Sequence, residues 1–542
     1  MEFFPHFWYN PHQRTEAVRR VYLDRHCPII LLLLAVICGN VYALQGSTGV
    51  NGSNAQAVHE LGITGKGIKI GLITARNVLT THLAFEPNTV FNYDYSGDGI
   101  GYNYHDTPFA GIIKSKGSYN HPYDIGVAPD AEIRCCRVAD NNDGVSRTWL
   151  QNALDDLMAI GCKVIVTGFQ LPPDEDPSWS RMYDYYAANY DIVFANAAGN
   201  NYSNVSVFGD GYNGITTGGL EDIVADDYSR VGEVTCPGPT IDGRRKPDIM
   251  APSTYQVAPG YSGSSNDYWY TTSGSGATSW AVPHTAGVAA LLLEYANQTT
   301  EADDGRNEVI KAVIVNSAFP NIDRKNGDST NPADPNNTWH NERGYGRVDV
   351  LRAVNTLSAG KISKDATVIT STAGWAYDTI SPSATHTYLI AGNKNERLVL
   401  TVTWNCAITK LGPNYSLESP LFNIDVTVKG PEGEPIFSEI DDVNNLEKVD
   451  IRLPADGNYT VSLHNITSKS RSYGLAFELL TPLTGDFNTD YIVDGYDLSR
   501  IAEEWLTAGA EADIVPDDIV NNLDFAEFAD NWLKIEKRYF CP

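Results

Sequence analysis

Short apolar runs alternate with helical patterns after residue 65, and this alternation constrains the fold more than any other feature of the chain. Helical patterns at 146–160 and 180–189 separate runs that have the length and β-branched content of buried parallel strands. Those runs span 68–73, 132–138, 163–167 and 191–195. The pattern predicts an α/β fold, a parallel sheet flanked by helices, whose active site lies beyond the carboxyl ends of the strands.

The segment Thr271–Tyr295 begins with small residues and continues as a long apolar helix. Thr278 and Ser279 fall where this helix starts, and Pro283 lies within its first turns, where a missing N–H costs least. Unpaired N–H groups and the positive end of the helix dipole stabilise negative charge at such a position. Ser279 is therefore a candidate nucleophile, and its alternative role is that of a simple helix cap.

Two other polar residues occupy comparable positions. His105 stands at a switch from polar to apolar residues, which predicts a helix start, and Asn200 follows the strand-like run 191–195. Taken alone, each has a structural explanation, as a capping or core histidine and as a turn residue. Taken together with Ser279, they supply a base, an amide donor and a hydroxyl.

These segments resemble the motifs of the subtilisin-like serine peptidases, the subtilases of peptidase family S8. Residues 277–287 (ATSWAVPHTAG) are similar to GTSMAxPHVAG, with Ala277 and Trp280 as departures. Residues 105–113 (HDTPFAGII) are similar to HGTHVAGII, with Asp106 and Pro108 as departures. The segments 126–131 (GVAPDA), 197–200 (AAGN) and 246–252 (KPDIMAP) follow the family in order, and the resemblance spans 54–357.

The resemblance implies a serine endopeptidase acting on polypeptides, with no cofactor for catalysis. Ser279 would attack the peptide carbonyl and His105 would take and return the proton, while Asn200 and the Ser279 N–H would bind the oxyanion. One motif departs in a consequential way, because Thr74 stands where the family has its aspartate. In subtilisin the loss of that carboxylate lowers turnover by about 3 × 10⁴.

A substitute carboxylate would restore the usual arrangement. Asp106 is the nearest candidate, although adjacent residues on a helix point to different sides, and Asp94 and Asp98 in the preceding loop are the others. The alternative hypothesis is a catalytically inactive subtilase fold that binds peptides or serves as a surface-anchored module. A calcium-dependent adhesion protein unrelated to peptidases would leave the motif order unexplained.

The N-terminal region predicts export. Arg19, Arg20 and Arg25 precede the apolar run 29–38, and the small-residue sequence Val41-Tyr42-Ala43 then allows cleavage after Ala43. Residues 1–43 are therefore interpreted as a signal peptide of a secreted or cell-surface protein; an uncleaved anchor is the alternative, but the run is short for a membrane span. The net charge of −28 argues against nucleic acid and anionic membranes as partners.

The rest of the chain predicts two further modules. Alternating short runs over 361–481 indicate an all-β sandwich. Residues 485–534 carry two EF-hand-like loops, each followed by a helix, which resemble a dockerin and imply Ca²⁺ and a cohesin-like receptor as partners. The expected ligands are Asp486, Asn488, Asp490, Ile492 (backbone), Asp494 and Asp497 in the first loop, and Asp513, Asp517, Ile519 (backbone), Asn521 and Asp524 in the second.

Overall fold

The computed structural model describes residues 44–532 except 223–226, 263–264, 271–276, 321, 326, 328–337, 366, 482, 488–492, 494 and 509–511. Its centre is an eight-stranded sheet with the order β10-β8-β7-β6-β1-β5-β2, and β9 pairs with β8. All neighbours along this order run parallel, whereas β9 is antiparallel. The strands are β1 (Lys69–Thr74), β2 (Val90–Asp94), β5 (Glu132–Arg137), β6 (Val164–Thr167), β7 (Val193–Ala197), β8 (Ile215–Glu221), β9 (Arg230–Val231) and β10 (Ile249–Pro252).

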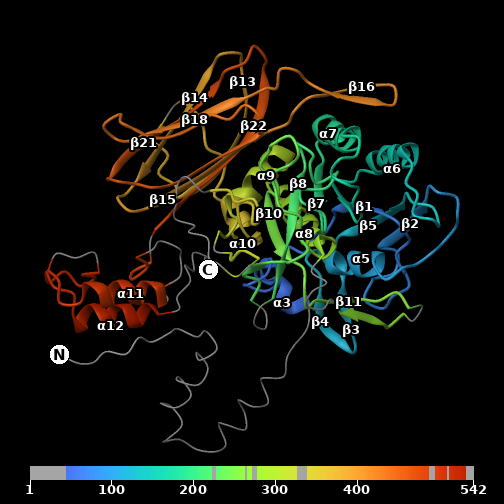
Figure 1. The fold of residues 1–542 in the computed structure, drawn as a ribbon, viewed down its shortest axis with the longest axis horizontal. Coiled ribbons are helices and arrows are strands. Elements are labelled where there is room, and N and C mark those ends of the chain that lie inside the picture. The colour runs from blue at the N-terminus through green and yellow to red at the C-terminus, as the bar shows by residue number, and fades with distance from the viewer. Residues whose placement is uncertain are drawn as a thin grey trace, which may run out of the picture. The chain divides into compact units, whose positions relative to one another are not determined.

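Helices cover this sheet (Figure 1). The helix α8 packs along β6, β7, β8 and β10 and also contacts α5, while α6 packs on β1 and α7 on β7. The helices are α3 (Leu44–Thr48), α4 (Ala55–Glu60), α5 (Asp106–Lys114), α6 (Arg147–Ala159), α7 (Ser178–Tyr190), α8 (Thr278–Gln298), α9 (Asn307–Asn316) and α10 (Val350–Ser358). Two short hairpins lie near the start of α8, and they are β3 (Lys116–Ser118) with β4 (His121–Ile125) and β11 (Val257–Pro259) with β12 (Tyr268–Tyr270).

The sheet separates two hydrophobic cores. The larger core joins one face of the strands to α5, α8, α9 and α10, with members such as Ile70, Val166, Ala286 and Val313. The smaller core joins the opposite side chains of the same strands to α6 and α7. Alternate residues of β1 thus enter different cores, as expected for a strand that is buried on both faces. The interpretation of 68–195 as α/β is therefore confirmed, and the described cysteines at 135, 136, 162, 236 and 406 are buried and unpaired.

After residue 360 the chain forms β sheets. Two four-stranded antiparallel sheets, β13-β22-β15-β20 and β14-β21-β18-β19, enclose one shared hydrophobic core, and β16 pairs with β17. The strands are β13 (Ala373–Ile380), β14 (Thr385–Gly392), β15 (Arg397–Trp404), β16 (Ile408–Leu411), β17 (Asn414–Leu417), β18 (Ile424–Lys429), β19 (Pro435–Glu439), β20 (Leu446–Arg452), β21 (Gly457–Asn465) and β22 (Arg471–Leu480).

Sequence patterns locate only some of these strands. The alternation of apolar residues predicts β14, β15, β18, β20, β21 and β22, but it does not reveal β13 at Ala373–Ile380. That strand contains Gly374 and Asp378, residue types that are rare in strands. Its Trp375 donates from Nε1 to the carbonyl of Leu357, near the end of α10. Tertiary packing against the parallel-sheet domain therefore stabilises β13 where local propensity is weak.

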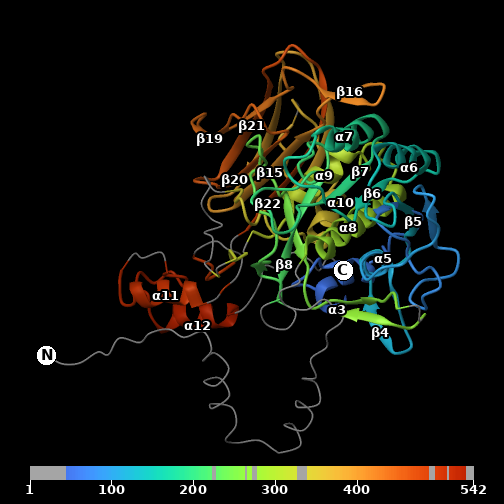
Figure 2. The same ribbon diagram turned by 45° about the vertical axis from the view of Figure 1, so that its right-hand side comes forward.

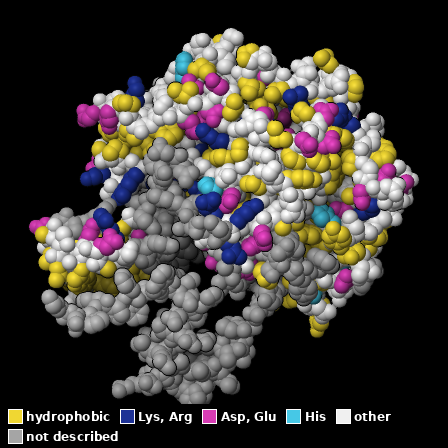
Figure 3. Space-filling model, in the orientation of Figure 1, with side chains coloured by type: hydrophobic (Ala, Val, Ile, Leu, Met, Phe, Trp, Pro, Cys, Tyr) yellow, Lys and Arg dark blue, Asp and Glu magenta, His cyan; other side chains and the backbone are white. Residues whose placement is uncertain are grey.

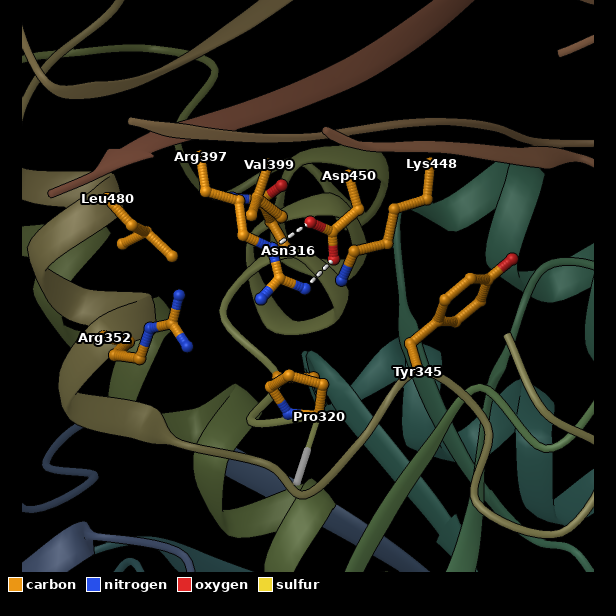
Figure 4. A pocket seen from close by; sticks show the side chains of 10 residues that line it. Asn316, Pro320, Tyr345, Arg352, Arg397, Val399, Lys448, Asp450 and Leu480 are labelled. Carbon is orange, nitrogen blue, oxygen red and sulfur yellow. Dashed lines mark hydrogen bonds and ion pairs between the residues drawn. The ribbon is translucent and has the colours of Figure 1, made fainter. Parts of the chain in front are cut away.

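A buried ion pair and a buried hydrogen bond join the C-terminal sheets to the parallel-sheet domain. Arg352 of α10 donates from Nη2 to Glu478 of β22 at 2.8 Å, and Lys448 of β20 donates to the Val315 carbonyl of α9 at 2.8 Å. Beside them Arg397 and Asp450 form a two-bond ion pair, seen as dashed lines in Figure 4. Arg352, Arg397 and Lys448 point into this small polar cavity (Figure 4). The two parts are thus packed through α9 and α10 rather than linked by a free tether.

Two short helices, α11 (Gly495–Glu504) and α12 (Asn522–Asn531), form a separate small core with Val493, Ile501, Val520 and Phe528. On the face drawn in Figure 3, Lys and Arg side chains are interspersed with Asp and Glu. Within the described residues there is no helix long and apolar enough to cross a membrane. The proposed signal peptide at 1–43 lies outside the described residues.

Candidate active site

The carboxyl ends of three adjacent strands deliver the candidate residues to one edge of the sheet. Arg76 follows β1, Gly168 follows β6 and Asn200 follows β7, and these strands are neighbours in the order β7-β6-β1. A Cβ atom placed on Gly168 would lie 3.4 Å from Cε1 of His105, so the end of β6 passes directly beside the imidazole. The structure therefore brings His105 to the edge where ligand sites of parallel sheets form.

His105 and Asp106 face one another although they are neighbours in the chain. His105 is the N-cap of α5, with φ −102° and ψ −52°, and Asp106 is the first helical residue. Nδ1 of His105 lies 2.9 Å from Oδ1 of Asp106. The rule that adjacent helical residues diverge does not hold here, because His105 lies outside the regular helix. A carboxylate accepts hydrogen bonds, so this contact puts the imidazole proton on Nδ1 and leaves Nε2 free to accept.

The carboxylate of Asp106 is held on its other side by the chain that leaves β1. Its Oδ2 accepts a hydrogen bond from the backbone N–H of Arg76 at 2.7 Å, and Asp106 is only 1% exposed. Asn103 fixes the start of the helix, since its Oδ1 accepts from the N–H groups of both His105 and Asp106. Asn103 and Arg76 were not among the residues expected from sequence; an asparagine just before a helix start is the signal that points to Asn103.

Thr74 ends β1 and is fully buried, and its hydroxyl bonds to groups other than His105. Its Oγ1 donates to the Arg76 carbonyl at 2.8 Å and lies 3.2 Å from Sγ of Cys135. Thr74 thus stabilises the turn after β1, and the backbone N–H of Arg76 in this turn binds Asp106.

The other two candidate carboxylates bind elsewhere. Asp94 accepts from the N–H groups of Ser96 and Gly99, and these bonds lower its pKa despite the opposing effect of desolvation. Asp98 accepts from the N–H of Asn141 at 2.7 Å. Asp106 is therefore the carboxylate that the structure places against His105.

Asn200 lies at the N-terminus of α8. Its Oδ1 accepts from the backbone N–H of Thr278 at 2.8 Å and from the Thr278 hydroxyl at 3.1 Å. The backbone N–H of Asn200 donates to Oε1 of Gln170 at 2.6 Å, so a side chain from the loop after β6 holds the main chain of Asn200 in place. With the amide oxygen engaged by Thr278, the Nδ2 group is the part of Asn200 left for another acceptor.

Ser279 is the second residue of α8 and is partly exposed. The residue after it, Trp280, is buried, and its ring centroid lies 5.2 Å from that of His105. Phe109 stacks on the imidazole of His105, with the ring centroids 5.7 Å apart. The start of α8 and the start of α5 therefore meet at the histidine. Trp280, which replaces the methionine of the family motif, was not predicted to contact His105.

Phe169, which lies just after β6, packs edge-on to Phe208 with the ring centroids 5.7 Å apart. His284, further along α8, is fully buried between the Ser53 hydroxyl and the Gln256 amide oxygen, at 3.3 and 3.2 Å. Burial lowers its pKa to about 3. His284 is thus a neutral core histidine.

The second acidic loop gathers three carboxylates. Oxygens of Asp513, Asp517 and Asp524 lie within 4.8 Å of one another. Asn521 caps α12 and donates from Nδ2 to Asp517, and Ile519 is partly exposed beside them. Asp524 is desolvated, which raises its pKa, but backbone N–H donors from Val515 and Asn521 reverse this and lower it.

The first acidic loop is described only in part. Asp486 and Asp497 are buried, and Oδ1 of Asp497 accepts from the N–H of Phe487 at 2.7 Å. Asn488, Asp490, Ile492 and Asp494, which complete the expected ligand set, lie outside the described residues. The second loop, in contrast, lies wholly within the described residues. Oxygen atoms that bind one Ca²⁺ at 2.3–2.6 Å can be at most about 5 Å apart, so its three carboxylates fit that ion.

The parallel sheet places a serine at one helix start, a histidine at another and an amide after the end of β7, as expected for a subtilisin-like fold. The family model described as "Subtilase family" matches residues 65–346, just over half of the chain, and the chain belongs to that family, Peptidase_S8.

Curated relatives agree with this assignment. Subtilisin E of Bacillus subtilis (strain 168) is 26% identical over 262 residues, which cover 46% of this chain and 62% of that protein. Serine protease AprX of the same organism is 26% identical over 317 residues, covering 51% and 65%. The membrane-bound transcription factor site-1 protease of Rattus norvegicus is 27% identical over 321 residues, covering 57% and 27%. The chain thus spans about a quarter of the site-1 protease and under two thirds of the two bacterial proteins.

A solved structure of the prenylagaramide maturation protease PagA is also similar. It is 19% identical, with a TM-score of 0.43, and the match covers 56% of this chain and 98% of that one.

Proposed function

We propose that this chain is a secreted serine endopeptidase in which Asp106 takes the role of the aspartate that the family carries at the position of Thr74. The observation that carries the proposal is the 2.9 Å separation of His105 Nδ1 and Asp106 Oδ1. Because Asp106 is buried and its second oxygen accepts from the Arg76 N–H, the carboxylate is held in one orientation. A fixed carboxylate orients the imidazole and stabilises the imidazolium that forms during catalysis.

The reaction follows from these roles. Ser279 Oγ attacks the carbonyl carbon of the scissile peptide while His105 Nε2 takes the hydroxyl proton. The carbonyl oxygen becomes negative and accepts hydrogen bonds from Asn200 Nδ2 and the Ser279 N–H, which lies at the positive end of α8. His105 then gives its proton to the leaving amine as the C–N bond breaks. Water, activated by His105, hydrolyses the acyl-enzyme and releases Ser279.

A fluorophosphonate probe tests this proposal directly. We expect the folded protein to be labelled at Ser279, and we expect Ser279→Ala to abolish the labelling. The Ser203→Ala variant, which changes an exposed serine, is the matched control and should label normally. Absence of labelling in the folded protein would contradict the proposal and favour the alternative, an inactive subtilase fold that binds peptides.

We also propose that residues 361–481 form a β-sandwich domain that supports the peptidase domain. The two sheets with one shared core, and the buried pair between Arg352 and Glu478, support a structural role. The sandwich contributes no residue to the proposed catalytic group.

We further propose that residues 485–534 form a dockerin-like module that binds Ca²⁺ and docks to a cohesin-like receptor. The close approach of Asp513, Asp517 and Asp524 supports this. Bound calcium would neutralise these carboxylates and hold the loop before α12. Calorimetric titration of the full chain should detect Ca²⁺ binding that weakens in the Asp513→Asn/Asp517→Asn double variant but not in Asp530→Asn, an exposed residue of α12. Equal binding by the double variant would contradict the assignment of this loop.

A further inference from the structure

The backbone nitrogen of Leu44 donates a hydrogen bond to a buried carboxylate. It lies 2.9 Å from Oδ1 of Asp124, a residue of β4 that is 2% exposed. The other oxygen of Asp124 lies 2.7 Å from Nδ1 of His121. In both ribbon views α3, which begins at Leu44, lies close to β4, and the two elements are in contact (Figures 1 and 2). One oxygen of the buried Asp124 carboxylate therefore receives its hydrogen bond from the main-chain N–H of Leu44.

The side chain of Leu44 is buried beside the candidate active site. Leu44 is 0% exposed and forms a small hydrophobic cluster with Ile112, Ala258 and Trp280. These three residues belong to α5, β11 and α8, and Trp280 follows Ser279 and packs against the ring of His105. The position of Leu44 is thus coupled by direct contact to the two helices that carry His105 and Ser279.

The sequence before Leu44 has the pattern of a leader that is removed. The apolar run 29–38 is followed by Val41-Tyr42-Ala43, and small residues at such positions permit cleavage after Ala43. We propose that hydrolysis of the Ala43–Leu44 bond generates the mature N-terminus, and that its α-ammonium group pairs with Asp124 and holds Leu44 against Trp280. In that hydrolysis, carried out by a signal-type peptidase, water supplies the hydroxyl of the new Ala43 carboxyl group and a proton for the Leu44 amine.

Cleavage changes the chemistry of the contact without moving its atoms. In the uncleaved chain a neutral amide N–H faces Asp124, whereas in the cleaved chain the same nitrogen carries a positive charge. A buried carboxylate is costly unless it is paired, and charge-assisted hydrogen bonds are roughly twice as strong as neutral ones. The new terminus would therefore stabilise β4 and the His121 ring, which stacks on Tyr268 of β12 at 3.7 Å. In the chain, β12 precedes α8, whose second residue is Ser279.

Mass spectrometry of the N-terminal peptide of the exported full-length chain is the first test. We expect Leu44 as the first residue in both the unaltered chain and Ser279→Ala, because the cleavage does not depend on the proposed peptidase activity. A retained leader or a terminus at another residue would overturn the proposal.

Acylation of the α-amine tests the ion pair in the unaltered mature protein. An amine-acylating reagent should modify the Leu44 nitrogen at least about tenfold more slowly in the folded protein than in urea, because the paired ammonium is buried. Equal rates in the two states would overturn the ion pair. This readout requires neither a substitution nor catalytic activity.

A double-mutant cycle completes the test in the Ser279→Ala background, where self-digestion cannot interfere. One Gly placed before Leu44 displaces the charge from Asp124 and should lower Tm by at least about 2 °C. The same extension should have no effect in Asp124→Asn, and its full effect in Asp130→Asn, the matched control, whose carboxylate pairs with Lys116 instead. An equal fall in the Asp124→Asn background would overturn the proposal.

Discussion

The hydroxyl of Thr74 lies 3.2 Å from the thiol of Cys135, at the end of β1 where the subtilase motif has its aspartate. Cys135 is fully buried, and burial raises the pKa of its thiol to about 12. The end of β1 thus carries an uncharged hydroxyl beside an uncharged thiol. The carboxylate belongs instead to Asp106, the first residue of α5. The two positions are linked through Arg76, whose carbonyl accepts from Thr74 and whose N–H donates to Asp106.

Placing the family's aspartate at position 74 is therefore expected to bring no gain in catalytic activity. In Thr74→Asp a second carboxylate would be buried near Asp106, and the hydrogen bond to the Arg76 carbonyl would be lost. We expect kcat/KM on a peptide substrate, and the rate of fluorophosphonate labelling, to stay equal or fall. Thr74→Ser, which keeps the hydroxyl, is the control. A gain of tenfold or more in Thr74→Asp would mean that the parent enzyme lacks an orienting acid.

Asp106→Asn should lower turnover by about 10⁴, because an amide cannot stabilise the imidazolium of His105 and favours the wrong tautomer. Steady-state kinetics on the same substrate measures the effect. Asp94→Asn, which changes a carboxylate of the preceding loop, should retain activity. If both variants behaved alike, Asp106 would not be the orienting acid.

Asn200→Ala should lower kcat by about 10²–10³ with little change in KM, since the amide is proposed to bind the oxyanion only as it forms. Asn204→Ala, which removes an exposed amide bonded to the Pro239 carbonyl, serves for comparison. The unfolding temperature of both variants should be measured as well, because Asn200 also accepts from Thr278. A fall in kcat of less than tenfold would remove Asn200 from the proposed mechanism.

His284 should make the fold sensitive to acid. Its pKa is about 3 in the folded protein, against an ordinary value of about 6.5, because burial disfavours the charged form. Between these values the unfolded chain binds a proton that the folded chain does not, so stability falls as pH falls, by up to about 1.4 kcal/mol per pH unit. His284→Gln should flatten this slope in urea unfolding at pH 7 to 4, measured in the Ser279→Ala background.

The control for this experiment is His464→Gln, which replaces an exposed histidine of β21. Its slope should match that of the parent. An unchanged slope in His284→Gln would show that other groups cause the acid sensitivity.

Asp450→Ala should destabilise the C-terminal sheets by about 3–5 kcal/mol, because it leaves Arg397 buried without its carboxylate beside Lys448. Asp378→Ala breaks the partly exposed pair with Lys364 and should cost no more than about 1 kcal/mol. Urea unfolding of both variants in the Ser279→Ala background gives the comparison. Similar small losses in the two variants would argue against a structural role for the buried pair.

Much of the fold can be predicted from local patterns. The runs that form β1, β5, β6 and β7 are continuous and apolar because those strands are buried on both faces, and the helices between them carry one apolar face. Strand β13 escapes prediction because its stability comes from Trp375 and its neighbours in space. The motifs around Ser279, His105 and Asn200 identify these candidates before any coordinates, since each pairs a polar residue with the end of a strand or the start of a helix.

The partner of His105 could not be decided in the same way. Three aspartates lie within 11 residues of it in the chain, and sequence separation alone does not rank them. The contact with Asp106 depends on the position of His105 as the N-cap of α5 and on the N–H of Arg76, which follows the end of β1. The same is true of Leu44, whose nitrogen meets Asp124 from 80 residues away.

The sequence by itself determined the class of fold, the subtilase family and the hydroxyl, imidazole and amide that carry the proposed chemistry, because these follow from periodicity and short motifs. Only the tertiary structure decided which carboxylate faces His105, that Trp280 joins the two helix starts, and that Leu44 reaches Asp124. Those relationships depend on how distant segments approach one another, to within the length of a hydrogen bond, and no local pattern encodes that distance.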